Sequence, residues 1–520
     1  MSNENQSLNE GQEQEFNAEF VQAMAVIENK DPAKRSVEDD CMLASYYFML
    51  SEGKDRSKIE QALEIFLRHG VTLYESPIWN YHVGICYYYL RQPEAAMRFL
   101  SKAKQDEEYG ATSAQYLQSC IDILQIPNFA HNFTERSQEC YKQLLEQVPS
   151  LLKEITEQYQ SPNGISKELH KKVMELLNIA FARVSFNLSC TQEPGAQVWD
   201  PTITFEPMGN IARALAINYF IEHAPKELTQ LIKLRLGLPR DSSFSLNFGK
   251  TKLNHDSVKC FVNKRNDDYH VFLHCPQLKN LLKDDFYAAY KMHLDLANSA
   301  LGEIGALSQR ITFDVIYELK APDDSILGPV PLSCLYDELT KLQVKLDGPT
   351  KELLDSSYRD YEPNKPSVAN DKLEPHDSVK CTIVPDRSDV VKGYSRCFQL
   401  INEFKGNDYR LTDELHENGA VAGYFAFEGQ KIFALNSPIK FDEFLSKLQE
   451  TICDELGSDD ALLVGQATGS QYYYVDFIAF DLKALLERVL PLFAIFDIPV
   501  YFGTFRSIVP PVSLSVENKA

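Results

Sequence analysis

The clearest pattern of apolar and polar positions lies in residues 76–108, SPIWNYHVGICYYYLRQPEAAMRFLSKAKQDEE. Apolar residues recur at helical spacing on both sides of Arg91-Gln92-Pro93, and the proline favours a break in the helix at that point. The stretch therefore predicts two short helices joined by a turn.

Small and aromatic residues recur through these two helices, at Gly84, Tyr87, Ala96, Leu100 and Ala103. Small residues allow two helix axes to approach, and an aromatic ring fills the remaining gap. The pattern resembles the tetratricopeptide repeat (TPR), a helix pair with a period of about 34 residues. The resemblance implies stacked helix pairs and, by default, a protein that binds other proteins.

The same spacing occurs one period earlier, where Ala62 and Phe66 take the positions of the second helix. An insertion at 51–56 interrupts the pattern after the first helix of that copy, 41–50, and residues 111–124 form a half copy. We therefore expect two repeats and a cap. The alternative interpretation is a plain antiparallel helical bundle with alanine at tight crossings.

Beyond the repeats, alternating apolar and polar residues mark strands between further helices. We expect six segments: an acidic disordered leader at 1–17, TPR-like helical repeats at 18–125, a helical connector at 126–182, an α+β domain at 183–322, a linker with a short helix at 323–392, and a second α+β domain at 393–515. The predicted fold class is multidomain α plus α+β, with N-terminal TPR-like helical repeats followed by two mixed α/β sheet domains. As a whole, this arrangement is similar to large bacterial TPR-containing proteins of uncharacterised function.

Individual elements follow from the same patterns. Residues 184–189 and 202–207 alternate in polarity and predict a β-hairpin. Thr134 is a candidate cap for a helix that runs to Tyr159. The sequence GQATGS at 465–470 lacks the lysine of a phosphate-binding loop, so it predicts a hairpin connection.

Charge and composition narrow the function classes. The net charge of −22 argues against nucleic acid and against anionic membrane surfaces as partners. No run of about 18 apolar residues is present, so no membrane span is expected. The leader lacks the apolar core of a signal peptide. Eleven scattered cysteines without a CxxC pair predict reduced thiols and a cytoplasmic location.

Candidate reactive residues are few. The hexapeptide HDSVKC occurs twice, at His255–Cys260 and His376–Cys381. The repeat is a trace of duplication or a coincidence, or its His and Cys act as base and nucleophile or as metal ligands. On a strand its His and Cys point to opposite faces, which disfavours pairing. His270 and His274 share a strand face but lie about 13 Å apart, too far for one metal ion.

Two functions of different classes follow. No GxSxG, HExxH or GxGxxG motif is present, and we assign no catalytic residue, cofactor or metal. The first hypothesis is a protein that binds a protein or peptide partner. The sequence does not indicate its oligomeric state. The alternative is an enzyme of unknown class with its site between the two α+β domains and the repeats as a docking arm. A deep cleft with converging polar groups would favour the enzyme.

The interaction hypothesis names its own contact residues. The first helix of each repeat lines the concave groove of such stacks, and tyrosine and arginine anchor many interfaces. The candidate partner-binding residues are Asn80, Tyr81, Tyr87, Tyr88 and Arg91. About half of the tyrosines could instead pack against the next helix.

Overall fold

The computed structural model describes residues 22, 24–161, 164–191, 200–265, 268–362, 385–428, 438–452, 460–496 and 499–514. The chain forms two compact units. The helical unit comprises Met1–Pro127 and Ile508–Pro510, and the mixed unit comprises Asn128–Ser507 and Pro511–Ala520. The leader expected at 1–17 and the second HDSVKC copy lie outside the described residues.

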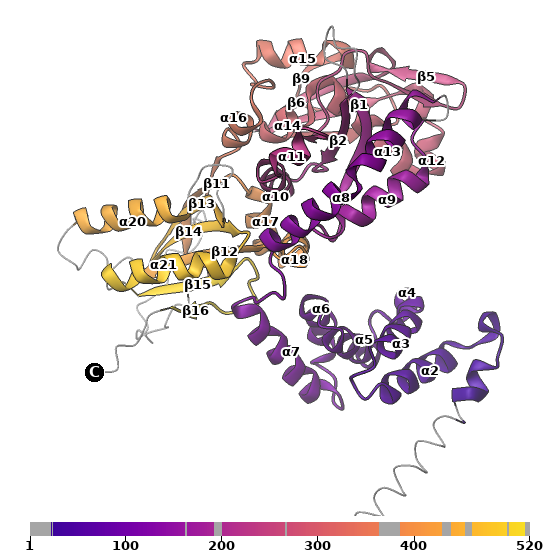
Figure 1. The fold of residues 1–520 in the computed structure, drawn as a ribbon, viewed down its shortest axis with the longest axis vertical. Helices are drawn as coiled ribbons and strands as arrows, with labels where there is room; N and C mark the ends of the chain where they lie inside the picture. The colour runs from indigo at the N-terminus through magenta and orange to yellow at the C-terminus, as the bar shows by residue number, and fades with distance from the viewer. Residues whose placement is uncertain are drawn as a thin grey trace, which may run out of the picture. The chain divides into compact units, whose positions relative to one another are not determined.

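The helical unit consists of short helices with defined starts (Figure 1): η1 (Pro32–Lys34), α2 (Val37–Leu50), α3 (Arg56–Arg68), α4 (Gly70–Leu73), α5 (Pro77–Tyr89), α6 (Pro93–Ala103) and α7 (Gly110–Gln125). The Ser36 side chain accepts a hydrogen bond from the Asp39 backbone N–H, which caps α2. Pro77 and Pro93 occupy the first turns of α5 and α6, where a missing N–H costs no helical hydrogen bond. The predicted break before Pro93 is therefore observed.

Helices α5 and α6 approach closely where the sequence has small residues. A Cβ atom on Gly84 would lie 2.7 Å from Leu100 Cγ. Ala96, Leu100 and Ala103 are completely buried (0% exposed). Other antiparallel helix pairs pack in the same way, so the repeat assignment stays a prediction.

Residues 508–510 contribute to the core of the helical unit. Val509 is 3% exposed and belongs to the same buried cluster as Leu117, Ile121 and Leu124 of α7. The Gln125 side chain donates to the Pro510 carbonyl oxygen at 3.5 Å. A segment distant in sequence therefore completes the packing of α7.

The first part of the mixed unit combines helices with a three-stranded sheet: α8 (Phe133–Gln160), α9 (Lys167–Leu177), β1 (Ser185–Thr191), β2 (Asp200–Glu206), α10 (Ile211–Glu222), α11 (Lys226–Thr229) and β3 (Lys233–Leu236). Strands β1 and β2 pair antiparallel, which confirms the predicted hairpin, and β3 joins β2 in parallel. Helix α8 is capped by Asn132 rather than Thr134, because the Asn132 side chain accepts from Glu135 N–H.

A second part is built on a four-stranded sheet of order β8-β7-β6-β9, with a separate β4-β5 hairpin. Its elements are β4 (Ser245–Phe248), β5 (Thr251–Asn254), η2 (His255–Ser257), β6 (Lys259–Arg265), β7 (Asp268–His274), η3 (Pro276–Leu278), α12 (Leu281–Asp284), α13 (Phe286–Leu301), α14 (Glu303–Ser308), β8 (Ile311–Val315), β9 (Ser325–Pro331) and α15 (Leu332–Lys341). Strand β9 lies beyond residue 322, where we expected a domain to end. Its two prolines hide it from a strand pattern, and an edge strand tolerates them.

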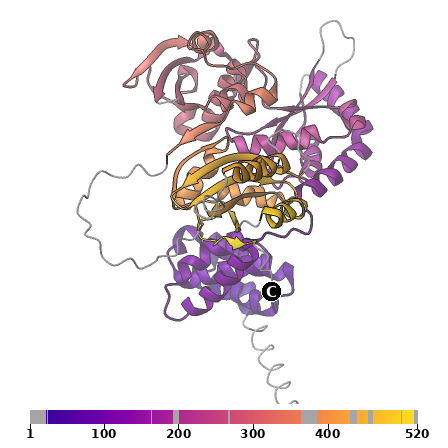
Figure 2. The same ribbon diagram turned by 90° about the vertical axis from the view of Figure 1, so that its left-hand side faces the viewer.

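The third part is a seven-stranded sheet of order β10-β11-β13-β14-β12-β15-β16, in which all pairs are antiparallel. Its elements are α16 (Thr350–Asp355), β10 (Arg359–Tyr361), β11 (Val390–Ser395), α17 (Phe398–Gly406), α18 (Arg410–Glu417), β12 (Val421–Glu428), α20 (Pro438–Ile452), β13 (Ala461–Gly469), β14 (Tyr472–Ala479), α21 (Leu482–Phe496), β15 (Val500–Thr504) and β16 (Val512–Ser513). The pairing of β13 with β14 confirms the hairpin expected at GQATGS. Helices α20 and α21 lie beside this sheet (Figures 1 and 2), where Phe444 and Phe493 contact the rings of β12.

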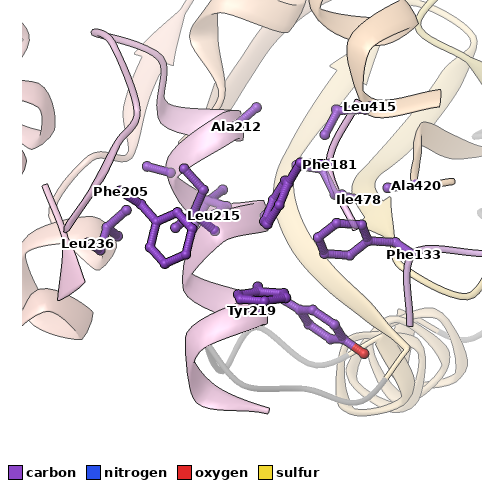
Figure 3. Close-up of a cluster of buried hydrophobic side chains, with 14 of the residues drawn as sticks. Phe133, Phe181, Phe205, Ala212, Leu215, Tyr219, Leu236, Leu415, Ala420 and Ile478 are labelled. Atoms are coloured by element: carbon purple, nitrogen blue, oxygen red, sulfur yellow. The ribbon is translucent and has the colours of Figure 1, made fainter. Parts of the chain in front are cut away.

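One hydrophobic core joins the first and third parts (Figure 3). Phe133 of α8 lies 5.7 Å from Phe480, and Tyr219 of α10 stacks on the same ring at 3.9 Å between centroids. Residues more than 250 positions apart in the chain therefore share this core. The described residues confirm a mixed α plus α+β layout.

Candidate functional sites: an aromatic strip and a polar-lined cavity

Asn80 of α5 is a structural residue. It is completely buried (0% exposed), and its Nδ2 donates to the carbonyl oxygens of Tyr74 and Ser76 at 2.8 Å each. These carbonyls precede α5, so Asn80 fixes the start of the helix. The prediction that Asn80 contacts a partner is corrected, because its side chain is enclosed and its Nδ2 already donates to two backbone carbonyls.

Tyr87 and Arg91 have different environments. The Tyr87 ring stacks on Phe99 of α6 with centroids 5.5 Å apart, so it packs α5 against α6, as we expected for about half of the tyrosines. Arg91 is exposed in the turn after α5 and has a positive φ of 62°. Arg91 remains accessible, whereas Tyr87 is largely committed to the helix pair.

Four rings from three helices form what we term the aromatic strip: Phe48 of α2, Tyr88 and Tyr89 of α5, and Tyr116 of α7. Ring centroids lie 5.5 Å apart for Phe48–Tyr89 and 5.0 Å apart for Tyr88–Tyr116. The hydroxyl oxygens of Tyr89 and Tyr116 are 3.3 Å apart. Tyr89 is 37% exposed and the others are half-buried. The strip therefore crosses three helices and is partly open to solvent.

Tyr81 extends this aromatic region with a second pair. Its ring lies 4.7 Å from that of Tyr109. Burial raises the pKa of Tyr81 and Tyr116, and neighbouring phenols raise both further. Both hydroxyls therefore stay protonated at neutral pH and can donate hydrogen bonds. Of the predicted contact residues, Tyr81 and Tyr88 thus belong to the aromatic region.

The mixed unit contains a cavity of about 470 Å³ between residues that the sequence assigns to different domains. Its lining includes Met208, Ile211, Asp268, Tyr290, Leu294, Asn298, Glu303, Leu307, Arg310, Thr312, Phe313, Ser357, Arg396, Phe398, Gln399 and Asn402. Apolar walls with a few converging polar groups are typical of small-molecule sites of this size.

Glu303, at the start of α14, is the buried acid of this cavity. It is 3% exposed, and its two oxygens accept from the backbone N–H groups of Met208 at 3.2 Å and Leu238 at 3.0 Å. Burial raises the pKa of Glu303 to about 7, and the nearby carboxylates of Glu206 and Asp295 contribute to the rise. At neutral pH this group can therefore hold or release a proton.

Arg310 is the cation that follows α14. Its Nε lies 2.7 Å from Asp268 Oδ1 and its Nη2 donates to Asp268 Oδ2 at 2.8 Å. The guanidinium carbon lies 4.8 Å from the centre of the Phe398 ring. Within the described residues, Nη1 of Arg310 makes no hydrogen bond. Asp268 thus orients the guanidinium and leaves one of its nitrogens available.

Asn298 of α13 is the most unusual polar residue of the lining. It is only 7% exposed, and its side-chain amide has no hydrogen-bond partner among the described residues, although its backbone oxygen accepts from Gly302 at 2.7 Å. A buried amide normally has a partner. Because Asn298 lines the cavity, the open space is where such a partner would bind.

The repeated hexapeptide forms no reactive pair in its described copy. His255 Nε2 lies 2.9 Å from Ser299 Oγ, which donates to Leu296 O at 2.9 Å. Cys260 Sγ donates instead to the Val330 carbonyl oxygen at 3.4 Å. His255 and Cys260 thus have separate structural partners.

The histidines of β7 are also separate. His270 Nδ1 lies 2.8 Å from Thr312 Oγ1, and His274 Nδ1 lies 3.2 Å from the Ile316 carbonyl oxygen. No group of three or more potential metal ligands occurs among the described residues. The cysteines among the described residues are free thiols, and most of them are buried. Burial raises the pKa of Cys86 and Cys140 to about 12.

Sequence reasoning missed the cavity because its lining comes from elements far apart in the chain. One local signal was present: Glu303 interrupts the apolar run LANSALGEIGAL at 296–307. A charged residue in such a run is either a partnered structural group or part of a site.

Comparison with protein-family models, curated proteins and solved structures finds no match to this chain. Within the described residues, no helix combines the length and apolar content that a membrane span requires.

Proposed function

We propose that this protein binds another polypeptide through the aromatic strip of its helical unit, with the helix pairs acting as TPR-like repeats. The observation that supports the proposal is the chain of ring contacts across α2, α5 and α7. Tyrosine combines a large apolar face with a hydroxyl donor, and it dominates many interfaces.

Helix α2, which supplies Phe48 to the strip, also exposes two methionines. Met42 and Met49 are 45% and 47% exposed. They are seven residues apart and so lie on one face of the helix. Flexible methionine side chains adapt to varied partners. The partner would therefore be a peptide segment with aromatic or aliphatic anchors, held by contacts to the rings and by hydrogen bonds to the phenols.

A displayed random-peptide library, selected on the full chain, tests this proposal. We expect enriched peptides to carry apolar anchors and to lose about 30-fold in affinity on Tyr89→Ala, the loss typical of an interface hot spot. Tyr287→Ala is the matched control, because Tyr287 is 84% exposed in the mixed unit. Equal losses for both variants, or selected peptides that bind without the strip, would contradict the proposal.

A second candidate function is an enzyme, and the cavity beside Glu303 is the observation that favours it. A carboxyl with a pKa of about 7 could serve as general acid or base. Turnover by the full chain that is abolished by Glu303→Gln, yet unaffected by Tyr89→Ala, would favour this function over partner binding.

A further inference from the structure

The cavity of the mixed unit has features that point to a class of ligand, independently of any partner of the helical unit. We propose that it binds a small carboxylate with an apolar body, whose oxygens accept hydrogen bonds from Asn298 Nδ2 and Arg310 Nη1. The two nitrogens belong to residues that line the same space.

The polar end of the ligand follows from the donors that are available. The Asn298 amide is buried at 7% exposure without a partner among the described residues, and the guanidinium of Arg310 is held in place by two contacts to Asp268. A guanidinium and an amide N–H both donate, and a carboxylate oxygen accepts such bonds more strongly than a neutral oxygen. A ligand that accepts hydrogen bonds from both groups therefore gains affinity.

The charges of the lining balance except at Glu303. Arg310 and Arg396 are its cations. Asp268 pairs with Arg310, and Asp355 of α16 lies 3.2 Å from Arg396. Burial holds Glu303 close to half-protonated at neutral pH, since its pKa is about 7. The cavity therefore admits an anion most readily at slightly acidic pH, where Glu303 is mostly protonated, and less readily as Glu303 ionises.

The apolar body of the ligand follows from the walls. Leu294, Leu307 and Phe398 line the cavity next to the polar groups. The volume of about 470 Å³ falls within the range of small-molecule sites. A short aryl or alkyl chain would contact these walls while its carboxylate reaches the donors.

Three probes with one body separate the head groups: 3-phenylpropionate, 3-phenylpropionamide and 3-phenylpropylammonium. We would titrate each into the full chain by calorimetry, with saturation-transfer NMR for weak binding. We expect the carboxylate to bind at least about tenfold more tightly than the amide, the factor set by one charge-assisted hydrogen bond. Raising the pH from 6 to 8 should weaken binding of the carboxylate probe, because Glu303 becomes anionic. Binding of the amide probe should not change.

Variants locate the binding. Asn298→Asp should abolish carboxylate binding, and the matched control Asn247→Asp, which makes the same charge change on exposed β4, should not. Leu307→Trp fills the cavity from a half-buried position and should abolish binding of all three probes. Unfolding curves show whether each variant is folded. If Asn298→Asp does not fold, Leu307→Trp still tests the proposal.

Three outcomes would overturn the proposal. One is that the carboxylate does not bind at millimolar concentration. Another is that the amide or the ammonium probe binds as tightly as the carboxylate probe. The third is that carboxylate binding survives in folded Leu307→Trp protein.

Discussion

Arg387 and Asp476 form an enclosed ion pair in the mixed unit, with 3% and 0% of their side chains exposed. Arg387 Nη2 also donates to Tyr361 Oη at 2.6 Å, and its guanidinium carbon lies 5.1 Å from the centre of the Tyr474 ring. Buried charges are tolerated only when they are paired and hydrogen-bonded. The pair therefore couples the segment before β11 to strand β14.

Asp476→Asn should destabilise the protein by about 3–5 kcal/mol, because it leaves the Arg387 guanidinium buried without a counter-charge. Urea unfolding measures the loss. The double variant Arg387→Met/Asp476→Leu should recover much of it, since apolar groups of similar size can replace a buried pair. A loss below about 1 kcal/mol for Asp476→Asn would mean that water reaches the pair.

Gly84→Ala should destabilise the helical unit by about 1–3 kcal/mol, although alanine favours helices. The added Cβ would lie 2.7 Å from Leu100 Cγ and 3.2 Å from Leu100 N. Gly406→Ala is the matched control, because no atom lies within 4 Å of its Cβ position in α17. We expect Gly406→Ala to be neutral or slightly stabilising in thermal unfolding. Equal effects of the two changes would show that α5 and α6 do not touch at Gly84.

Local patterns predicted the elements but not their associations. The small residues Gly84, Ala96 and Ala103 indicated a contact between two helices, because the spacing and crossing of such a pair are encoded within 34 residues. The hairpins were also predicted from short local patterns. By contrast, Asp476 pairs with Arg387, which lies 89 positions away, and no local pattern links the two residues.

The candidate sites show the same division. Tyr81 and Tyr88 were identified from the repeat pattern. Asn80 is excluded by its burial, and no spacing indicates that an asparagine will donate to the carbonyls of the turn before its own helix. Tyr116 joined the strip through packing of α7. The cavity residues Asn298 and Arg310 meet only in the folded chain, so a single sequence contains no periodic signal for them.

Val509→Asp should loosen α7, because it places a charge among apolar side chains that include Leu117 and Leu124. Hydrogen exchange of the α7 amides should accelerate by more than about tenfold. Helix α3 is the internal control, since its buried side chains belong to a separate cluster. Unchanged exchange in α7 would show that residues 508–510 do not stabilise the helical unit.

Glu303 predicts a pH dependence of stability. Its pKa of about 7 in the folded protein exceeds the ordinary value of 4.5, so the folded protein holds this proton more tightly than the unfolded chain does. The contribution of protonated Glu303 to the free energy of unfolding is fully present below about pH 4.5 and is lost as the pH rises through 7. A shift of this size corresponds to about 3 kcal/mol in the free energy of unfolding.

Glu303→Gln separates this effect from other titrations, including that of Glu403, whose pKa is also raised to about 7 by burial. Glutamine does not titrate, so the difference between the native protein and the variant should shrink between pH 5 and pH 8. At pH 5 the variant should be about 1–3 kcal/mol less stable, because its amide nitrogen opposes the N–H of Met208 or Leu238. Urea unfolding at four pH values measures this, with exposed Glu227→Gln as the control. A difference that stays constant across this range would show that Glu303 is ionised throughout.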